Sequence, residues 1–137
     1  MPEHPQLLQT VIDATDVRTA AEFYRRLLGL TYRPGDETPT DGTPDDADWL
    51  VLRDASDVNR LAFQLVERLE QTTWPSPDVP MQMHLDCTVS SLEELQRHRE
   101  RAESLGARLL SDRTDDPEEP LYVLADPFGH PFCIFVA

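Results

Sequence analysis

One sequence pattern occurs twice in this chain, and the repeat limits the possible folds more than any other feature. Each copy is a short alternating run, then an amphipathic stretch, then a glycine, then further short runs typical of β-strands. These three parts fall at residues 8–13, 16–28 and 29 in the first copy, and at 83–89, 91–105 and 106 in the second. Neither copy has enough core to be stable alone, so we expect two modules that pack into one domain.

The first amphipathic stretch carries the signals of an α-helix. Asp16 can accept hydrogen bonds from the free amides of the first turn, and Gly29 can take the left-handed conformation that ends a helix. Apolar side chains recur between them at helical spacing. They predict a buried face made of Val17, Ala20, Tyr24, Leu27 and Leu28, with Phe23 on its flank.

The second amphipathic stretch begins with a capping box. Ser91 and Glu94 can satisfy two backbone amides reciprocally, and Gly106 follows the end of the helix. Arginine and glutamate side chains form its solvent-facing side. The predicted buried face consists of Leu92, Leu95, Ala102 and Leu105.

The remaining strands are predicted by the alternation of side chains. They fall at residues 49–53 and 61–66 in the first half, and at 108–110, 121–124 and 132–136 in the second. The order is therefore strand, helix, strand, strand, strand, twice over. This order predicts an α+β fold of paired βαβββ modules with mixed sheets.

A length of 137 residues suits one compact domain. Within this single domain, 1–137, we place module one at about residues 6–70, a linker at about 71–80 and module two at about 81–137. Residues 34–48 are rich in Pro, Asp, Thr and Gly, and we expect them to form a mobile loop.

Charge and composition disfavour several classes of function. Twelve basic and twenty-six acidic residues give a net charge of −14, which repels phosphate backbones and argues against nucleic-acid binding. No apolar run approaches the ~20 residues of a membrane-spanning helix, and the first residues lack the pattern of a secretory signal. The two cysteines form no C-x-x-C motif. We expect a soluble cytoplasmic protein with reduced thiols.

Three segments in a fixed order carry a family resemblance. They are residues 16–29 (DVRTAAEFYRRLLG), the triplet His84-Leu85-Asp86, and residues 126–132 (DPFGHPF). They resemble the first helix, the second-module start and the last hairpin of the vicinal oxygen chelate superfamily of glyoxalases, bleomycin-resistance proteins and dioxygenases. The resemblance is closest to its glyoxalase-like branch in high-GC bacteria. It implies curled sheets, a U-shaped cleft that holds a small molecule between the modules, and a homodimer.

The resemblance also indicates where a metal would sit. Metal-binding members take one ligand from the first strand and one from the last strand of each module. The matching positions are Gln9, Gln64, His84 and Cys133. Side chains alternate across a strand, so burial of Leu8, Ile12, Phe63 and Leu65 would turn Gln9, Asp13 and Gln64 to the opposite face. The same alternation places His84, Asp86 and Cys133 on one face of the second module.

This set of side chains is a poor metal site. Only one of the four positions is a histidine, none is a carboxylate, and amide oxygens are weak ligands for magnesium or manganese. His84 and Cys133 could hold zinc only as an incomplete pair, to which Asp86 or Asp13 could add a carboxylate. We therefore expect no complete metal site and no resident cofactor, with a divalent metal as the alternative.

His84 and Asp86 are the candidate catalytic residues. His84 can act as a general base or anchor a ligand, with Asp86 orienting it, or it can belong to a polar network without chemistry. Cys133 is either a nucleophile activated by His84 or a small buried side chain, and we favour the second interpretation. Cys87 should lie on the opposite face from Cys133, which argues against a disulfide between them.

Aromatic residues supply candidate walls for an apolar ligand. Phe135 shares the predicted face of Cys133, whereas the face of Trp49 is not fixed by the sequence. Tyr122 fits core packing better. Trp74, between prolines in the linker, could cover the edge of the ligand site or a dimer contact.

Three functions remain, in order of preference. The first is a protein that binds a small, partly apolar molecule through Gln9, Asp13, Gln64, His84, Cys133, Phe135 and Trp49, without a complete metal site. The second is a metal-dependent enzyme of the lyase, isomerase or dioxygenase type with a degenerate His, Cys and Gln ligand set. The third is a partner protein without a ligand.

Overall fold

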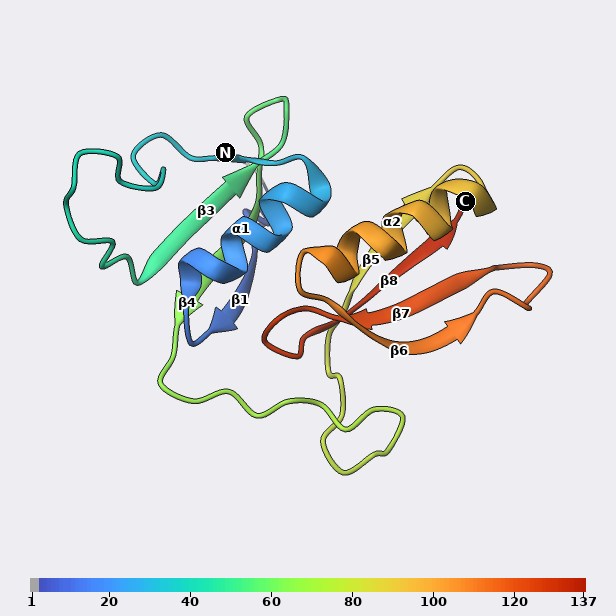
Figure 1. Ribbon diagram of the computed structural model, residues 1–137. Helices are drawn as coiled ribbons and strands as arrows, with labels where there is room; N and C mark the ends of the chain where they lie inside the picture. Colours follow the sequence, from blue (N-terminus) through green and yellow to red (C-terminus); the bar gives the residue numbers. More distant parts are fainter. Residues whose placement is uncertain (1–2) are drawn as a thin grey trace. The chain divides into compact units, whose positions relative to one another are not determined.

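The computed structural model describes residues 3–137 and has two compact units, which meet in the chain between Leu69 and Glu70 (Figure 1). The first unit contains β1 (Thr10–Ala14), α1 (Val17–Leu28), β2 (Thr31–Tyr32), β3 (Trp49–Arg53) and β4 (Asn59–Leu65). The second contains β5 (Leu85–Val89), α2 (Leu92–Ser104), β6 (Arg108–Arg113), β7 (Leu121–Ala125) and β8 (Pro131–Val136). This order confirms the predicted α+β fold of two βαβββ modules.

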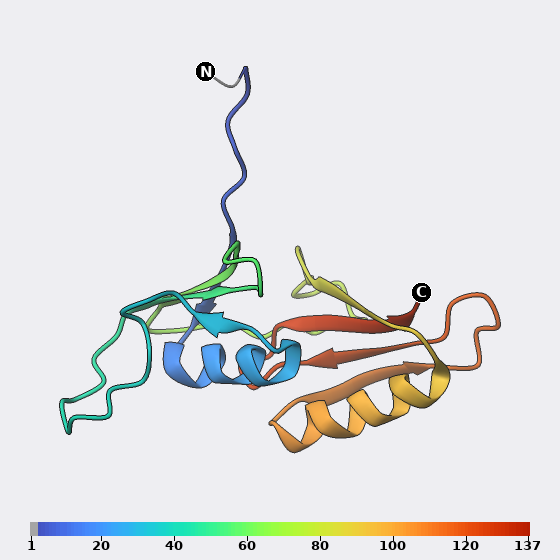
Figure 2. The same cartoon turned by 90° about the horizontal axis from the view of Figure 1, so that it is seen from above.

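The two sheets have the same topology. Their strand orders are β1-β4-β3-β2 and β5-β8-β7-β6. In each sheet the first and last strands of the module are parallel neighbours, and the other pairs are antiparallel. One helix lies along one face of each sheet, as Figure 2 shows for each unit separately. The opposite face of each sheet carries the positions that the sequence assigns to ligand binding.

In the first unit, α1 is held by its caps and by aromatic packing. The Asp16 carboxylate accepts a hydrogen bond from the Thr19 amide at 3.1 Å, and Gly29 ends the helix with a φ of 69°. Tyr24 of α1 stacks on Phe63 of β4 with ring centroids 5.8 Å apart, and both side chains are fully buried.

In the second unit, α2 begins with a variant of the predicted capping box. Ser91 Oγ accepts from the Glu94 amide at 3.1 Å, but the Glu94 carboxylate accepts from the amide of Ser90, at 3.0 Å, one residue earlier than expected. Tyr122 of β7 lies under this helix and donates its hydroxyl to Gln96 Oε1 at 2.6 Å. Its core position is confirmed, since only 4% of the side chain is exposed.

Four leucines predicted or assumed to be buried are exposed, so those expectations were wrong. Leu28 is the last residue of α1, Leu92 is the first of α2, Leu65 is the last of β4, and Leu8 precedes β1. All four lie at or beyond the end of an element, where the opposing layer no longer covers them. Periodicity predicts which face of an element a side chain occupies, but not how far along the element the opposing layer packs against that face.

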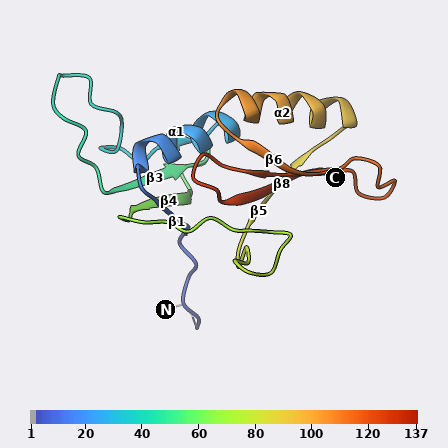
Figure 3. The same ribbon diagram turned by 60° about the horizontal axis from the view of Figure 1, so that its bottom comes forward.

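The loop at residues 34–48 was expected to be mobile, but the structure fastens it at two points. Arg18 of α1 donates to the Asp45 carboxylate at 2.7 Å and to the Asp36 carbonyl at 2.6 Å. The Asp36 carboxylate in turn accepts the Val51 amide of β3 at 2.9 Å. The Arg18 guanidinium lowers the pKa of Asp45. The loop is therefore tied to the beginning of α1 (Figure 3).

Within residues 3–137, none of the helices is both long enough and apolar enough to cross a membrane.

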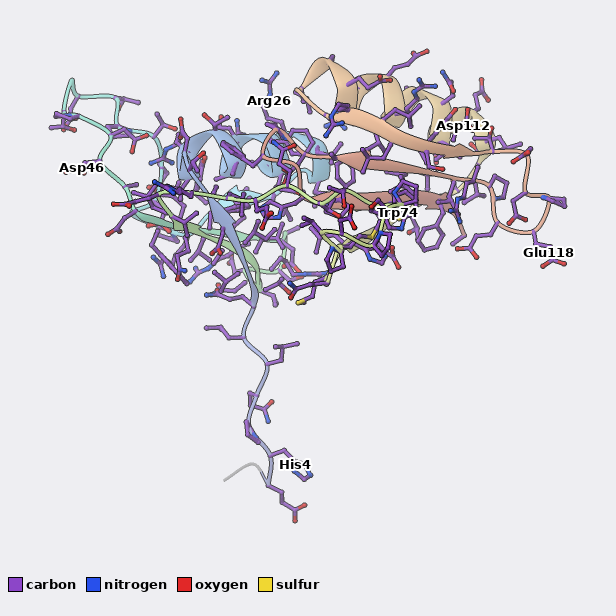
Figure 4. The ribbon with its side chains drawn as sticks, turned by 90° about the horizontal axis from the view of Figure 1, so that it is seen from below. His4, Arg26, Asp46, Trp74, Asp112 and Glu118 are labelled. Carbon is purple, nitrogen blue, oxygen red and sulfur yellow. The ribbon has the colours of Figure 1, made fainter. Side chains whose placement is uncertain are left out.

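Replacing Asp16 with Ala should lower the free energy of unfolding by about 1 kcal/mol, because the Thr19 amide loses its acceptor. Chemical denaturation measures this effect. Asp46→Ala, in the exposed part of the loop (Figure 4), is the matched control and should change stability little. Equal effects of the two substitutions would contradict the assigned cap.

Replacing Arg18 with Gln should release residues 34–48, since the side chain makes three hydrogen bonds to that loop. Partly exposed ion pairs contribute little, so we expect a stability loss of about 0.5–1 kcal/mol. Limited proteolysis with mass analysis of the fragments should show faster cleavage within the loop. The exposed Arg68→Gln is the control, and cleavage at the parent rate in Arg18→Gln would contradict the tether.

Candidate functional site

The sheet surface of the second unit that faces away from α2 is called the open face here. Residues paired across neighbouring strands share a face, so the register defines its rows. One row runs Asp86, Cys133, Val123, Ser111 from β5 to β6, and the next runs Thr88, Phe135, Leu121, Arg113. His84 precedes β5 with the same parity as Asp86. The open face thus has a polar edge, an apolar centre and a second polar edge.

His84, Asp86 and Cys133 form a compact group at the first polar edge. Their imidazole nitrogen, carboxylate oxygen and sulfur atoms all lie within 4.8 Å of one another. His84 Nε2 is 3.2 Å from Asp86 Oδ1, and both side chains are substantially exposed. The sequence predicted that these three side chains share a face, and the strand register agrees.

Cys133 is a thiol rather than a thiolate at neutral pH. Burial raises the pKa of Cys133 to about 11, and the charge of Asp86 and a hydrogen bond to its carboxylate act in the same direction. An activated nucleophile needs a lowered pKa, so the geometry favours the unreactive interpretation. Cys87 faces α2 from the other side of β5, and burial raises its pKa to about 11 as well. Both cysteines are free, as expected.

The turn before β8 sets the position of Cys133. The Asp126 carboxylate is buried and accepts the backbone amides of Phe128 and His130 at 2.8 and 3.0 Å. Gly129 has a φ of 91°, and a Cβ at that position would lie 2.6 Å from Gln71 Cγ. The motif at residues 126–131 therefore closes one specific turn, from which β8 enters the sheet opposite β5.

The second polar edge was missed by the sequence reasoning. β6 extends to Arg113, three residues further than the sequence predicted. A bulge at Leu110 breaks the alternation of side chains and shifts the pairing between Leu109 and Ser111. This shift places Ser111 and Arg113 on the open face. The Arg113 guanidinium packs 5.5 Å from the ring centroid of Trp74, which Figure 4 shows among the linker side chains. Only the tryptophan in the proline-rich linker could have signalled this contact.

In the first unit the candidate residues separate into two places. Gln9 accepts from Asn59 Nδ2 at 2.9 Å, whereas Gln64 donates to Asp13 Oδ1 at 3.3 Å. Gln9 and Asp13 are four residues apart along the chain, or about 13 Å in an extended strand. Trp49 pairs with Gln64, which fixes its face as that of Asp13 and Gln64. Gln9 and Gln64 are therefore not brought together.

The register also corrects the assignment of Gln64. Gln9 and His84 both lie seven positions before a helix N-cap, from 9 to 16 and from 84 to 91. By the same count Val11 corresponds to Asp86, and Val11 pairs with Ala62 just as Asp86 pairs with Cys133. The counterpart of Cys133 is therefore Ala62, and Gln64 corresponds to Phe135. We call His84, Asp86 and Cys133 the three-donor group. The equivalent positions of the first unit hold one amide and two hydrocarbon side chains.

Comparison with known proteins identifies the family. A model of the glyoxalase-like domain matches residues 9–135. No curated protein matches the sequence. Among solved structures, a glyoxalase, bleomycin-resistance protein and dioxygenase family enzyme from Burkholderia phytofirmans superposes with a TM-score of 0.68 at 16% identity. That match covers 94% of this chain and 96% of the other.

A second similar structure is the fosfomycin resistance protein FosX from Listeria monocytogenes. Its TM-score is 0.67 at 13% identity, and the match covers 98% of this chain and 94% of that one. Another crystal structure of the Listeria protein contains Mn(II) and a sulfate ion. At these identities the similarity shows a shared fold. With the family match over most of its length, the chain belongs to the glyoxalase-like domain family.

The three-donor group fits some metals better than others. Imidazole nitrogen, carboxylate oxygen and thiolate sulfur are ligands that suit zinc, while manganese prefers oxygen-rich sites without sulfur. Binding would require the Cys133 thiol to lose the proton that it shares with Asp86, so affinity would rise with pH. Among residues 3–137 this is the one group of three such donors, so a divalent metal is chemically possible at the open face.

Both thiols should react slowly with iodoacetamide in the folded protein. A pKa of about 11 leaves on the order of a hundredfold less thiolate at pH 7.5 than a free cysteine has. Mass spectrometry of alkylated protein over time measures this rate, which should rise as the pH approaches 11. Protein unfolded in urea is the control and should react as free cysteine does. Rapid alkylation of Cys133 at neutral pH would restore the nucleophile interpretation.

Proposed function

We propose that this chain binds a small, partly apolar molecule on the open face of its second unit. The observation that carries the proposal is the arrangement of this face, where polar groups stand at both edges of an apolar strip. Ligand sites combine apolar walls with a few polar groups that fix orientation. Phe135 and Leu121 are partly exposed and offer the apolar contacts. His84, Asp86 and Arg113 offer the polar ones.

The proposal includes a role for His84 that does not depend on catalysis. Its Nε2 lies against the Asp86 carboxylate, which orients the ring and leaves Nδ1 available to a ligand. Asp86 in turn accepts the hydrogen bond of the Cys133 thiol. The three side chains then form a connected polar edge against which a ligand's polar group can be placed.

A metal-dependent enzyme is the second candidate, favoured by one specific observation. His84, Asp86 and Cys133 have three metal-binding atoms within 4.8 Å of one another, and Asp86 is one of the two carboxylates that the sequence offered to complete the pair. A divalent ion bound there would supply a Lewis acid for lyase, isomerase or dioxygenase chemistry. The chain's own residues would then hold that ion from one sheet edge and place the substrate over Phe135.

The other expectations stay predictions. They are the U-shaped cleft, the packing of both modules into a single domain, the homodimer and the cytoplasmic location.

Metal analysis of the purified protein, with thermal unfolding in the presence of Zn²⁺, Ni²⁺ or Mn²⁺, separates the two candidates. The proposed function expects no stoichiometric metal and no stabilisation by these ions. It expects stabilisation by planar apolar compounds, by about 2.7 kcal/mol at a ligand concentration one hundred times the Kd. A stoichiometric metal whose binding is lost in Cys133→Ser would establish the second candidate instead.

His84→Ala should weaken binding of whichever compound stabilises the protein by about tenfold, the effect of one lost polar contact. Titration of the parent and the variant measures the two Kd values. His98→Ala, on α2, is the matched control and should leave the Kd unchanged. Equal Kd values for His84→Ala and the parent protein would remove His84 from the site.

A further inference from the structure

Arg113 is a cation without an anionic partner in a strongly acidic chain. All twelve basic residues are arginines, and they are outnumbered by twenty-six acidic ones. Six of the other arginines form ion pairs with nearby carboxylates. Arg113 forms none within the described residues, although Asp112, Asp115, Asp116, Glu118 and Glu119 follow or adjoin it in the chain. The Arg113 guanidinium, which forms no ion pair with these neighbouring carboxylates, is available to an anion of a ligand.

Trp74 determines where this guanidinium lies. The central guanidinium carbon of Arg113 lies over the indole, 5.5 Å from the ring centroid. The Trp74 amide donates to Thr72 Oγ at 3.1 Å, and Thr72 Oγ donates to the Val79 carbonyl at 2.7 Å. These hydrogen bonds fix the backbone at Trp74. A guanidinium carries five N–H groups, so contact with a ring leaves donors that a planar anion can use.

Two acidic side chains of the neighbouring hairpin, Asp112 and Glu118, lie away from Trp74. Asp112 has the opposite parity to Arg113 and pairs with Tyr122 on the side of α2. Its carboxylate accepts from the amide and hydroxyl of Thr114. Figure 4 shows Asp112 beside the helix and Glu118 at the far tip of the hairpin, both away from Trp74.

The surface next to Arg113 is apolar. Leu121 lies opposite Arg113 in the row, and Phe135 lies opposite Leu121. Within the two paired rows of the open face the acidic residue is Asp86, which belongs to β5, three strands away or about 14 Å across the sheet. It also interacts with His84 and Cys133. One anionic group is therefore accommodated at Arg113, whereas a second negative charge near Asp86 would be repelled.

We propose that Arg113, positioned by Trp74, is the anion-binding residue of the open face, and that the ligands are small apolar molecules with a single carboxylate. The carboxylate accepts two parallel hydrogen bonds from the guanidinium, and the apolar body lies on Leu121 and Phe135. This inference rests on the proposed function and names its ligand class. It requires no bond to form or break.

NMR titration with 3-phenylpropionate and its neutral isostere 3-phenylpropionamide tests the inference. The acid should bind about tenfold more tightly than the amide, since a hydrogen bond to a charged group contributes more than a neutral one. Arg113→Gln should abolish this preference, and Arg113→Lys should keep part of it, because lysine lacks the planar fork. Arg97→Gln, on α2, is the matched control and should behave as the parent does.

The positioning role of Trp74 has its own readout. Trp74→Leu should reduce the preference for the acid, and Trp74→Phe should keep most of it, because an aromatic face still supports the guanidinium. Thermal unfolding of each variant verifies that it folds.

The outcomes separate this inference from the proposed function. Equal binding of acid and amide to the parent protein, or a preference that survives in Arg113→Gln, would overturn the role of Arg113 and leave the open face as a site for neutral ligands. Failure of both compounds to bind at millimolar concentration would overturn the proposed ligand class and count against the proposed function too. An acid preference that is abolished in Arg113→Gln, partly kept in Arg113→Lys, reduced in Trp74→Leu and unchanged in Arg97→Gln supports the inference.

Discussion

The parallel pairing of β5 with β8 is the constraint on which the open face depends. Its register sets Asp86 opposite Cys133 and leaves His84 on the same side, so a carboxylate, a thiol and an imidazole meet at one sheet edge. A shift of one residue would turn Cys133 under α2 and bring Phe132 out, because the side-chain period of a strand is two. The buried Asp126 carboxylate, which closes the preceding turn, starts β8 in the required register.

The two units share a topology but not a chemistry. Counted from their helix caps, the positions of His84, Asp86 and Cys133 correspond to Gln9, Val11 and Ala62 in the first unit. Packing accounts for the repeated βαβββ topology, since each sheet needs a helix to cover one of its faces. Nothing in that packing requires donor atoms on the other face. The fold therefore indicates where a binding site can lie, and the side chains on the face opposite the helix determine what that site can bind.

Most of the fold could be predicted from the sequence, because caps and periodicity are local signals. Asp16, Gly29 and Ser91 mark helix ends through their own backbone and side-chain chemistry, and the structure confirms all three. The exposed Leu28 and Leu92 were missed because cover by another layer is a tertiary property. β2 has two residues, too few for alternation to be visible.

The candidate site was predictable only in part. Parity correctly grouped His84, Asp86 and Cys133, since strand alternation is visible in the sequence. The equivalence of Gln64 and Cys133 failed because it depends on the pairing between strands, which no local pattern shows. The face of Arg113 could not be predicted, because the bulge at Leu110 reverses the alternation within β6. The role of Trp74 could not be predicted either, because it depends on a long-range contact with Arg113.

The central claim is that the open face, rather than another surface, receives the ligand. Intermolecular nuclear Overhauser effects between the ring protons of 3-phenylpropionate and the protein methyl groups measure this directly. We expect contacts to Leu121, whose partly exposed side chain lies in the Arg113 row of the open face. Contacts to Leu95 on the α2 side, or only to residues of the first unit, would contradict the account.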